Sequence, residues 1–419
     1  MPTVETVVVG AGQAGLALSR HLTDLGREHV LLERGRVGER WRSERWDSFR
    51  LLSPNRHNLL PGQTLAGLDP DGFLDGRQVV DRFDSYARGF AAPVRTGVAV
   101  RRVEPGPRGW RVRADGSGTW DAAGVVVATG HYDRPYVPPL RHHLPGALAH
   151  LHTSSYRRPA QLPDGAVLVV GSGPSGQQVA LELARAGRRV HLAASRHRAL
   201  PRRYRGRDAY DWMDRLGILD RTVDSLPHGV RPNPPSVVLA GGARDLDLRV
   251  LAEAGVVLHG RLVGVSDGVA AFAADLPDRL AEADANAARF RALVDLYAAA
   301  YGHRSPRGDR GAGTAPASWS QRAPRSLDLR RAGVTSVVWA TGFRRDFSWV
   351  KAPVLDDHGE VVHRRGVTVA PGLSFLGLRW QWRRSSSFIG GVGQDASYLA
   401  EVIDARSRGR ELVTARRGA

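Results

Sequence analysis

The chain has 419 residues, 42% of them hydrophobic, a formal net charge of +18 and no cysteine. That length and composition are typical of a globular protein of two or three domains and exclude a disordered chain. The absence of cysteine excludes disulfide reduction through a redox-active Cys pair and zinc sites built on Cys, and the 15 histidines show no metal-ligand spacing, so we expect no metal. No apolar stretch is as long as a membrane span and the N-terminus leaves no room for a signal peptide, so we expect a cytoplasmic protein with no membrane partner.

The positive charge is almost entirely arginine, because Lys351 is the only lysine. Such a charge raises the question of a nucleic-acid or anionic-membrane partner. The arginines are spread along the chain, however, and no groove motif with interleaved aromatic residues accompanies them. We therefore expect no nucleic-acid partner.

One glycine pattern occurs twice, as Gly10-Ala11-Gly12-Gln13-Ala14-Gly15 and as Gly171-Ser172-Gly173-Pro174-Ser175-Gly176. Each copy follows a short valine-rich run that predicts a buried strand and opens a segment with helical apolar spacing. In such a turn the first glycine permits the bend, the second lets the backbone approach a pyrophosphate, and the third lets helix and strand pack closely. A single match is weak evidence, but each copy has a further glycine eleven positions later, which indicates a duplicated strand, helix, strand unit.

The two copies differ at the end of their second strand. The first ends in Glu33, where an acid accepts a hydrogen bond from an adenosine ribose hydroxyl. The second has Ala194, followed by Ser195, Arg196, His197 and Arg198, which suits a ribose 2′-phosphate. We therefore assign FAD to the first site and NADPH to the second. The alternative for Arg196 and Arg198 is a solvated surface.

Two apolar runs, 125–130 and 337–343, contain Ala-Thr-Gly and predict strands that each close a nucleotide-binding unit. The expected fold is α/β, with two Rossmann-like, three-layer ββα dinucleotide-binding domains. The FAD domain comprises residues 1–158 and 325–419, and the NADPH domain, residues 159–324, is inserted into it. Residues 276–301 have an amphipathic helical pattern, either a packed helix or a substrate lid, and residues 305–326 predict a flexible loop.

A further motif precedes the second glycine turn: Gly146, then His152, Tyr156 and Pro159. With the two glycine turns, Gly38, Trp41, both Ala-Thr-Gly runs and the C-terminal turn 390–395, it resembles the class B flavin monooxygenases, the flavin-containing, YUCCA-type and Baeyer-Villiger enzymes. The family's marker has Phe where this chain has Leu144 and two fewer residues before the histidine, unless His150 is the counterpart.

The resemblance implies an NADPH-dependent FAD monooxygenase, which passes one oxygen atom of O₂ to a small organic substrate at nitrogen, sulfur or a carbonyl carbon through a flavin C4a-(hydro)peroxide. Few side chains then act as acids or bases, and Asn55 is the one catalytic candidate, with loop capping as its alternative role. For FAD we expect Gly10, Gly12, Gln13, Gly15, Glu33, Arg40, Trp41, Thr129 and Asp395. For NADPH we expect Gly171, Ser172, Gly173, Ser175, Gly176, Ser195, Arg196, Arg198 and Thr341.

Several alternatives remain open at this point. Trp41 suits a core position as well as a flavin contact, and Thr129 and Thr341 suit strand ends that satisfy backbone groups. Tyr204, Tyr210 and Trp212 suit either a substrate channel or packing. For the whole chain, an NADPH:acceptor reductase or an oxidase without oxygen transfer is the first rival, and a flavoprotein that senses redox state or binds nucleic acid is the second. A homodimer is compatible with the sequence.

Overall fold

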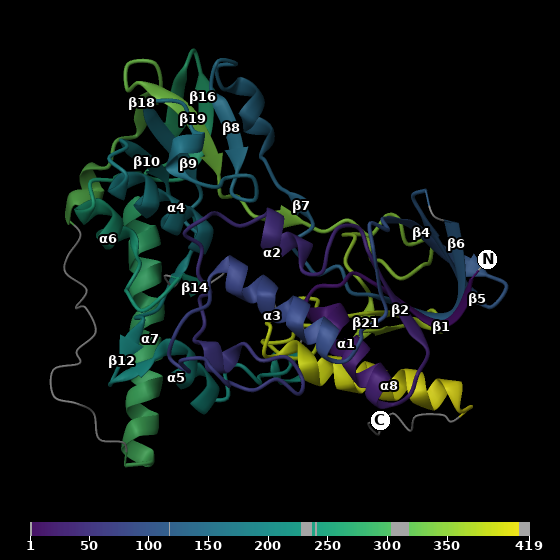
Figure 1. Ribbon diagram of the computed structural model, residues 1–419. Coiled ribbons are helices and arrows are strands. Elements are labelled where there is room, and N and C mark those ends of the chain that lie inside the picture. Colours follow the sequence, from purple (N-terminus) through teal and green to yellow (C-terminus); the bar gives the residue numbers. More distant parts are fainter. Residues whose placement is uncertain (1, 117, 228–236, 239–240, 303–317, 410–419) are drawn as a thin grey trace.

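The structure is a computed structural model, which describes residues 2–116, 118–227, 237–238, 241–302 and 318–409. It consists of two α/β units placed side by side, each built on a parallel sheet (Figure 1). The chain forms most of the first unit, then the second, and returns to the first with its last strands and helix. The expected insertion of one Rossmann-like unit into the other is confirmed.

The first unit has the sheet order β21-β22-β23-β6-β1-β2-β3, and its five strands from β23 to β3 run parallel. The strands are β1 (Thr3–Val9), β2 (His29–Glu33), β3 (Val94–Thr96), β4 (Val100–Gly106), β5 (Gly109–Ala114), β6 (Gly118–Val127), β21 (His363–Arg364), β22 (Val367–Thr368) and β23 (Leu373–Phe375). The helices are α1 (Gln13–Asp24), α2 (Glu39–Ser43), α3 (Gly76–Gly89) and α8 (Val392–Ser407).

Side-chain alternation along the strands creates three layers. In β1, Val8 packs in one core with Leu16 of α1 and Leu399 of α8, whereas its neighbours Val7 and Val9 pack in another core. That second core contains Val103, Trp110 and Val112 of β4 and β5, which form an antiparallel meander with β6. Because the sheet is covered on both faces, its strands are apolar throughout rather than alternating.

The second unit repeats this plan, with the parallel sheet order β15-β10-β9-β19-β8. Its strands are β8 (Ala149–His152), β9 (Ala166–Val170), β10 (Val190–Ala193), β15 (Val257–His259), β16 (Leu262–Ser266), β17 (Val269–Phe272), β18 (Ser326–Asp328) and β19 (Val334–Trp339), and its helices are α4 (Pro174–Arg185), α5 (Ala209–Arg215), α6 (Leu248–Glu253) and α7 (Leu276–Ala300). Helices α4 and α6 share a core with one face of the sheet, and the meander β16-β17-β18 shares a core with the other.

The expected domain boundaries at residues 158 and 325 are wrong. Both β8 and β19 pair within the second sheet, so residues 149–158 and 325–339 belong to the second unit. The physical reason is that these pairings are nonlocal: β19 lies between β8 and β9, more than 160 residues away in the chain. Local apolar patterning does not say which sheet a closing strand joins.

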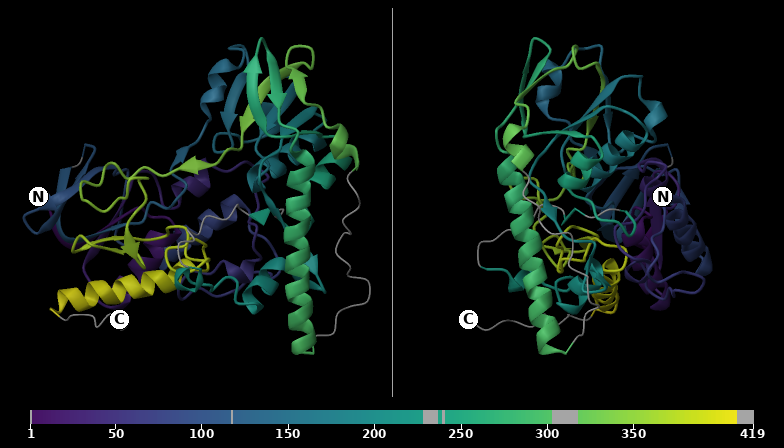
Figure 2. Two further views of the ribbon diagram at one scale, coloured as in Figure 1. Left: turned by 180° about the vertical axis from the view of Figure 1, so that it is seen from behind. Right: turned by 90° about the vertical axis from the view of Figure 1, so that its left-hand side faces the viewer.

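Helix α7 packs on the second unit, as the packing alternative predicted. Leu276 and Leu280 join the sheet core, and Phe290 and Val294 pack against Trp212 and Met213 of α5. The C-terminal end of α7 stands clear of the body (Figure 1, Figure 2), where Leu296 is exposed. Of the expected loop 305–326, residues 305–317 lie outside the described residues, and the rest is ordered structure: a 3-10 helix η5 (Ser318–Arg322) and the start of β18.

Short elements connect these parts: the pairs β7 (Arg134–Pro135) with β20 (Phe343–Arg344), β11 (Arg198–Ala199) with β14 (Val237–Val238) and β12 (Arg203–Tyr204) with β13 (Arg207–Asp208), and the 3-10 helices η1 (Asn55–His57), η2 (Pro139–His143), η3 (Pro159–Gln161) and η4 (Val223–Ser225). Within the described residues, no helix combines the length and apolarity needed to cross a membrane.

Candidate active site

The two glycine turns have the same geometry. Gly10 and Gly171 adopt φ values of +107° and +108°, and a Cβ on either would lie within 3 Å of the carbonyl oxygen of Ala128 or Ala340, respectively. Each turn is thus packed against the Ala-Thr-Gly segment of its own unit. A Cβ on Gly15 would lie 2.0 Å from the Gly10 carbonyl oxygen, and one on Gly176 would lie 1.9 Å from that of Gly171. The third glycine therefore permits strand and helix to pack closely, as expected.

The middle glycine of each turn has a different environment. Gly12 and Gly173 are the N-caps of α1 and α4, no side chain caps either helix, and an added Cβ would meet no atom within 4 Å. The first backbone N–H groups of a helix have no partner within the helix, so they remain available to an anion. Both helix N-termini face open space rather than packed protein.

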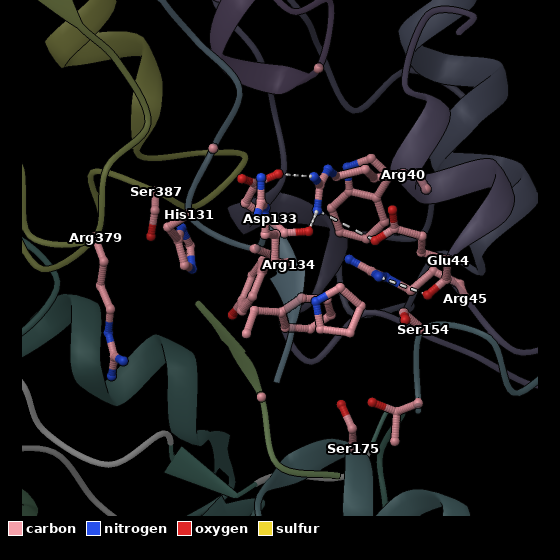
Figure 3. A pocket seen from close by; sticks show the side chains of 18 of the residues that line it. Arg40, Glu44, Arg45, His131, Asp133, Arg134, Ser154, Ser175, Arg379 and Ser387 are labelled. Atoms are coloured by element: carbon pink, nitrogen blue, oxygen red, sulfur yellow. Dashed lines mark hydrogen bonds and ion pairs between the residues drawn. The ribbon is translucent and has the colours of Figure 1, made fainter. Parts of the chain in front are cut away.

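That open space is one cavity of about 1280 Å³, which both turns line. We call it the central cavity; Figure 3 shows part of its wall. The described residues of the expected FAD set that line it are Gly10, Gly12, Gln13, Glu33, Arg40, Trp41 and Thr129. Those of the expected NADPH set are Gly171, Gly173, Ser175, Ser195, Arg196 and Thr341. Fold and turn geometry bring together residues more than 300 positions apart.

Glu33 lies at the end of β2 and is buried. One carboxylate oxygen accepts a hydrogen bond from the backbone N–H of Ala11 at 2.8 Å, and the other from that of Gly35 at 2.9 Å. The carboxylate thus holds the glycine turn and the segment after β2, and it lines the cavity as well. Each carboxylate oxygen has more than one acceptor position, so a ligand hydroxyl can also be bound.

Arg40 and Trp41 of α2 form the adjoining wall. The Arg40 guanidinium pairs with Asp133 at 2.9 Å, and the Trp41 indole N–H donates to the Gln13 side-chain oxygen at 3.2 Å. Trp41 also packs edge-on against Phe49 and Phe83, and it lines the cavity as well. The ring therefore has both the core position and the cavity position that the sequence allowed.

The end of β10 is held by Ser172. Its hydroxyl donates to the carbonyl of Ser195 and accepts from the N–H of Ser195 at 2.8 Å, which makes Ser172 a buried support rather than a cavity residue. Arg196 reaches the cavity with a side chain that is 71% exposed and lies 3.8 Å from Glu282. Arg198 does not line the cavity; burial and the neighbouring Arg289 and Arg196 lower its pKa.

Asn55 and Asp395 also do not line the cavity, and neither do Gly15 and Gly176. Asn55 is 5% exposed, and its amide donates to the Asp69 carbonyl and accepts from the Leu74 N–H, so it fixes a loop, which is the alternative role predicted for it. Asp395 is buried in the first turn of α8, where it hydrogen bonds to Ser386, and burial raises its pKa. Its other oxygen, Oδ1, has no partner among the described residues. Asp395 supports the loop that precedes α8 instead of lining the cavity.

Thr341 and the three aromatic residues Tyr204, Tyr210 and Trp212 have the following positions in the structure. The Thr341 hydroxyl donates to the Tyr136 carbonyl, which is the strand-end role, although the residue also borders the cavity. Tyr210 lines the cavity, whereas Trp212 is buried in the core with α7, and Tyr204 donates to Asp295. Of the three aromatic residues, one faces the cavity and two pack.

Sequence reasoning missed several residues of the cavity wall. His131 directly follows the first Ala-Thr-Gly, and burial, then the nearby Arg379, lowers its pKa to about 4, so its imidazole is neutral at pH 7. Arg45 lies over the rings of Trp41 and Phe49, at 4.8 and 5.5 Å from their centroids. Arg379 and Arg384 come from the segment after β23. The position after Ala-Thr-Gly marks His131 in the sequence, but nothing local marks the arginines.

The marker motif proves to be structural. The His152 imidazole is hydrogen bonded to the Gly342 carbonyl oxygen at 2.9 Å, and the buried Tyr156 hydroxyl donates to Glu182 of α4 at 2.9 Å. Both side chains fasten the start of the second unit beside its glycine turn. Among the described residues, no group of three or more His, Asp or Glu side chains is placed to hold a metal ion.

Comparison with known proteins agrees with this geometry. Residues 7–206 match the family model described as pyridine nucleotide-disulphide oxidoreductase. The fold is similar to a flavin-containing monooxygenase from Stenotrophomonas maltophilia, with a TM-score of 0.66 and 20% identity, covering 97% of this chain and 100% of that one. The chain thus has the two-domain, dinucleotide-binding fold of the flavin-containing monooxygenases.

Among curated relatives, the chain is 31% identical over 403 residues to a CzcO-like oxidoreductase of Geobacillus kaustophilus (strain HTA426), covering 96% of this chain and 98% of the relative. The chain belongs to this family of CzcO-like oxidoreductases. It is also 34% identical to the indole-3-pyruvate monooxygenase YUCCA1 of Oryza sativa subsp. japonica, over 43% of this chain and 45% of that one.

Proposed function

We propose that this protein is an NADPH-dependent FAD monooxygenase that places one atom of O₂ in a small organic molecule, at nitrogen, sulfur or a carbonyl carbon. The observation that carries the proposal is that the two glycine turns open onto one cavity, so that a hydride donor and its flavin acceptor share a space. The chain has no cysteine to pass electrons to a disulfide, so disulfide reduction does not compete with this proposal.

The first turn fits FAD. Gly12 leaves the N-terminus of α1 open toward the cavity, as a pyrophosphate requires, and the Glu33 carboxylate stands where a ribose hydroxyl binds. We assign FAD binding to Gly10, Gly12, Gln13, Glu33, Arg40, Trp41 and Thr129, with Gly15 as the packing residue of the turn.

The second turn fits NADPH. Gly173 and Ser175 lie at the open N-terminus of α4, and Ala194 directly follows β10, so no carboxylate opposes a 2′-phosphate there. Ser195 and Arg196 line the cavity next to it. We assign NADPH binding to Gly171, Gly173, Ser175, Ser195, Arg196 and Thr341, with Ser172 and Gly176 as supports and Arg198 as a cation beside Arg196.

Bound flavin would supply hydride acceptance and oxygen activation, and the residues of this chain would bind and orient the reactants and exclude water. Neutral His131 fits this task, because a half-buried imidazole without charge attracts water less than an imidazolium does. Arg45, held between two aromatic rings, contributes a fixed positive potential to the same wall.

Product analysis tests the proposal. The FAD-loaded protein is incubated with NADPH, ¹⁸O₂ and a panel of sulfides, amines and ketones, and the masses of the products are measured by mass spectrometry. One ¹⁸O atom per product molecule and one NADPH consumed per product are expected. NADPH oxidation that yields only hydrogen peroxide or a reduced quinone, whatever the panel contains, would establish the oxidase or reductase alternative instead.

A further inference from the structure

One part of the central cavity is lined by neither glycine turn. Its wall comes from α5 and from the segment after β23, through Tyr210, Met213, Arg379, Arg384, Phe388 and Ile389. We call this part the arginine end. In Figure 3, Arg379 lies beside His131 and Ser387, apart from Ser175 of the second turn and from Arg40 of the first unit. The space next to these residues is therefore not accounted for by the two nucleotide motifs.

Backbone hydrogen bonds fix the position of Arg384. Its N–H donates to the Arg221 carbonyl at 3.0 Å, and the N–H of Ser385 donates to the Leu219 carbonyl at 3.1 Å. These bonds join the segment after β23, from the first unit, to the segment after α5, from the second. Arg384 is consequently held where the two units meet at the cavity.

The charges around Arg384 are of its own sign. No carboxylate in the described part of the chain forms an ion pair with it, and the cations that act on it are Arg198, Arg379 and Arg221. Burial and then Arg198 lower its pKa. The cavity's lining carboxylates belong to other parts of the wall, and they are Glu33, Glu39, Glu44, Asp133 and Asp346.

The acids on either side of Tyr210 in the chain, Asp208 and Asp211, are already engaged, and Asp208 binds Arg202. Asp211 of α5 binds Arg56 at 2.7 Å and His57 at 2.9 Å, which keeps its pKa at about 2. A half-buried guanidinium among other guanidinium groups is unfavourable unless an anion completes the site. The protein supplies no such anion among its described residues, so the structure points to one that enters from outside.

The other residues of the arginine end indicate that the rest of that ligand is apolar. Tyr210 and Phe388 have ring centroids 6.4 Å apart, and Met213 and Ile389 add apolar surface. An apolar wall with one fixed cation matches an amphipathic molecule with a single acidic group. A guanidinium binds a carboxylate through two parallel hydrogen bonds, which orients the molecule as well as holding it.

We propose that Arg384 binds the carboxylate of the substrate, and that this protein acts on small carboxylic acids with an apolar body. The inference rests on the proposed function for the statement that the central cavity holds a substrate. The competing source of an anion at this place is the 2′-phosphate of NADPH, and the experiment below separates the two.

Binding of 4-fluorophenylacetate to the FAD-loaded protein is measured by ¹⁹F NMR line broadening, with neutral 4-fluorophenylacetamide as the matched probe. The acid should bind more tightly than the amide, and Arg384→Gln should raise the Kd of the acid by roughly 10- to 100-fold, the range of a charge-assisted hydrogen bond. The Kd of the amide should not change. Arg384→Lys, which keeps the charge but loses the paired hydrogen bonds, should give an intermediate Kd.

Arg383→Gln is the control, because Arg383 is adjacent in sequence, does not line the cavity and lies 3.8 Å from Asp220. It should leave both Kd values unchanged. An acid and an amide that bind equally well to the unaltered protein would overturn the inference. So would an Arg384→Gln protein whose KM for NADPH rises while its KM for NADH does not, because Arg384 would then hold the cofactor phosphate.

The two proposals fail separately. Arg384-dependent binding of the acid without oxygenation of any compound would refute the monooxygenase assignment and leave the acid site intact. Oxygenation of neutral compounds only, with acid binding unaffected by Arg384→Gln, would refute the acid site and leave the monooxygenase assignment intact.

Discussion

Glu33 ends β2, whereas Ala194 follows the end of β10, and this one difference is the chemical basis for assigning different cofactors to two similar turns. Glu33 has a double task, since its carboxylate also holds the N–H groups of Ala11 and Gly35. Arg196, in the segment after β10, has a mostly exposed side chain and lies 3.8 Å from Glu282.

Glu33→Ala should weaken FAD binding by at least tenfold, because it removes an acceptor for the ribose and loosens the glycine turn, each a loss of about 1 kcal/mol or more. The Kd is measured by fluorescence titration of apoprotein with FAD. The exposed Glu28, replaced by alanine, is the control. If the Glu33→Ala protein binds FAD as tightly as the control, Glu33 is not part of the FAD site.

Arg196→Ala should raise the KM for NADPH roughly tenfold or more and leave the KM for NADH nearly unchanged, because only NADPH carries the 2′-phosphate. Steady-state rates with both cofactors provide the measurement, and NADH is the internal control. Equal changes for the two cofactors would mean that Arg196 is a solvated surface residue.

Some residues of the cavity wall were not predicted from the sequence. Arg45 and Arg384 are each one polar residue in a loop, and no local spacing distinguishes them from the other arginines of this chain, whereas the position after Ala-Thr-Gly does mark His131. Only the tertiary fold brings them to one wall. Asn55 is the opposite case, a residue that the sequence suggested for catalysis. Both the nitrogen and the oxygen of its side-chain amide are hydrogen bonded to the backbone.

Among the elements, the two strand, turn and helix units were the most predictable part of the molecule. Their apolar runs, glycine spacing and helix starts depend on contacts within about 30 residues, which local sequence determines. Strands β8 and β19 were assigned to the wrong unit because their partners lie far along the chain. The glycines and helix start of the C-terminal turn 390–395 also predict a place at the cavity. In the structure, Asp395 of this turn instead supports a neighbouring loop.

Two glycines of the first turn should respond differently to alanine. Gly15→Ala places a Cβ 2.0 Å from the Gly10 carbonyl and should strongly destabilise the apoprotein or prevent folding, whereas Gly12→Ala meets no protein atom within 4 Å. Gly12→Ala should therefore keep the Tm of the apoprotein and lose FAD affinity at least tenfold. Scanning calorimetry and FAD titration measure both; a Gly12→Ala protein with normal FAD affinity would show that no ligand approaches this turn.

The edge of the second sheet should make folding stability depend on pH. His191 lies 3.0 Å from His259, and burial, then His259, lowers the pKa of His191 from 6.5 to about 4. Because the unfolded chain binds more protons than the folded one between these two values, stability falls as the pH falls through that window. The Tm should drop between about pH 7.5 and about pH 5, and His191→Gln should reduce the drop by a few degrees. The exposed His142, replaced by glutamine, is the control. An equal drop in all three proteins would exclude this histidine pair as the cause.

On the scale of the whole molecule, function depends on how the two units meet. Each turn alone is a half-site at the carboxyl end of its own sheet, and the central cavity exists because the units face each other across it (Figure 1). Loops of the first unit hold loops of the second, as Arg384 and Ser385 do with residues 219–221. The sequence predicted both halves, while the shape of the shared space required the structure.

Anaerobic reduction of the FAD-loaded protein by NADPH, followed by rapid mixing with oxygenated buffer, tests the monooxygenase assignment most directly. Stopped-flow spectra should show rapid bleaching of the flavin by NADPH. After oxygen is added, an absorbing species that differs from both reduced and oxidised flavin should persist while NADP⁺ is bound. Immediate return of oxidised flavin with one equivalent of hydrogen peroxide would contradict oxygen transfer, and a protein that binds no flavin would contradict the account as a whole.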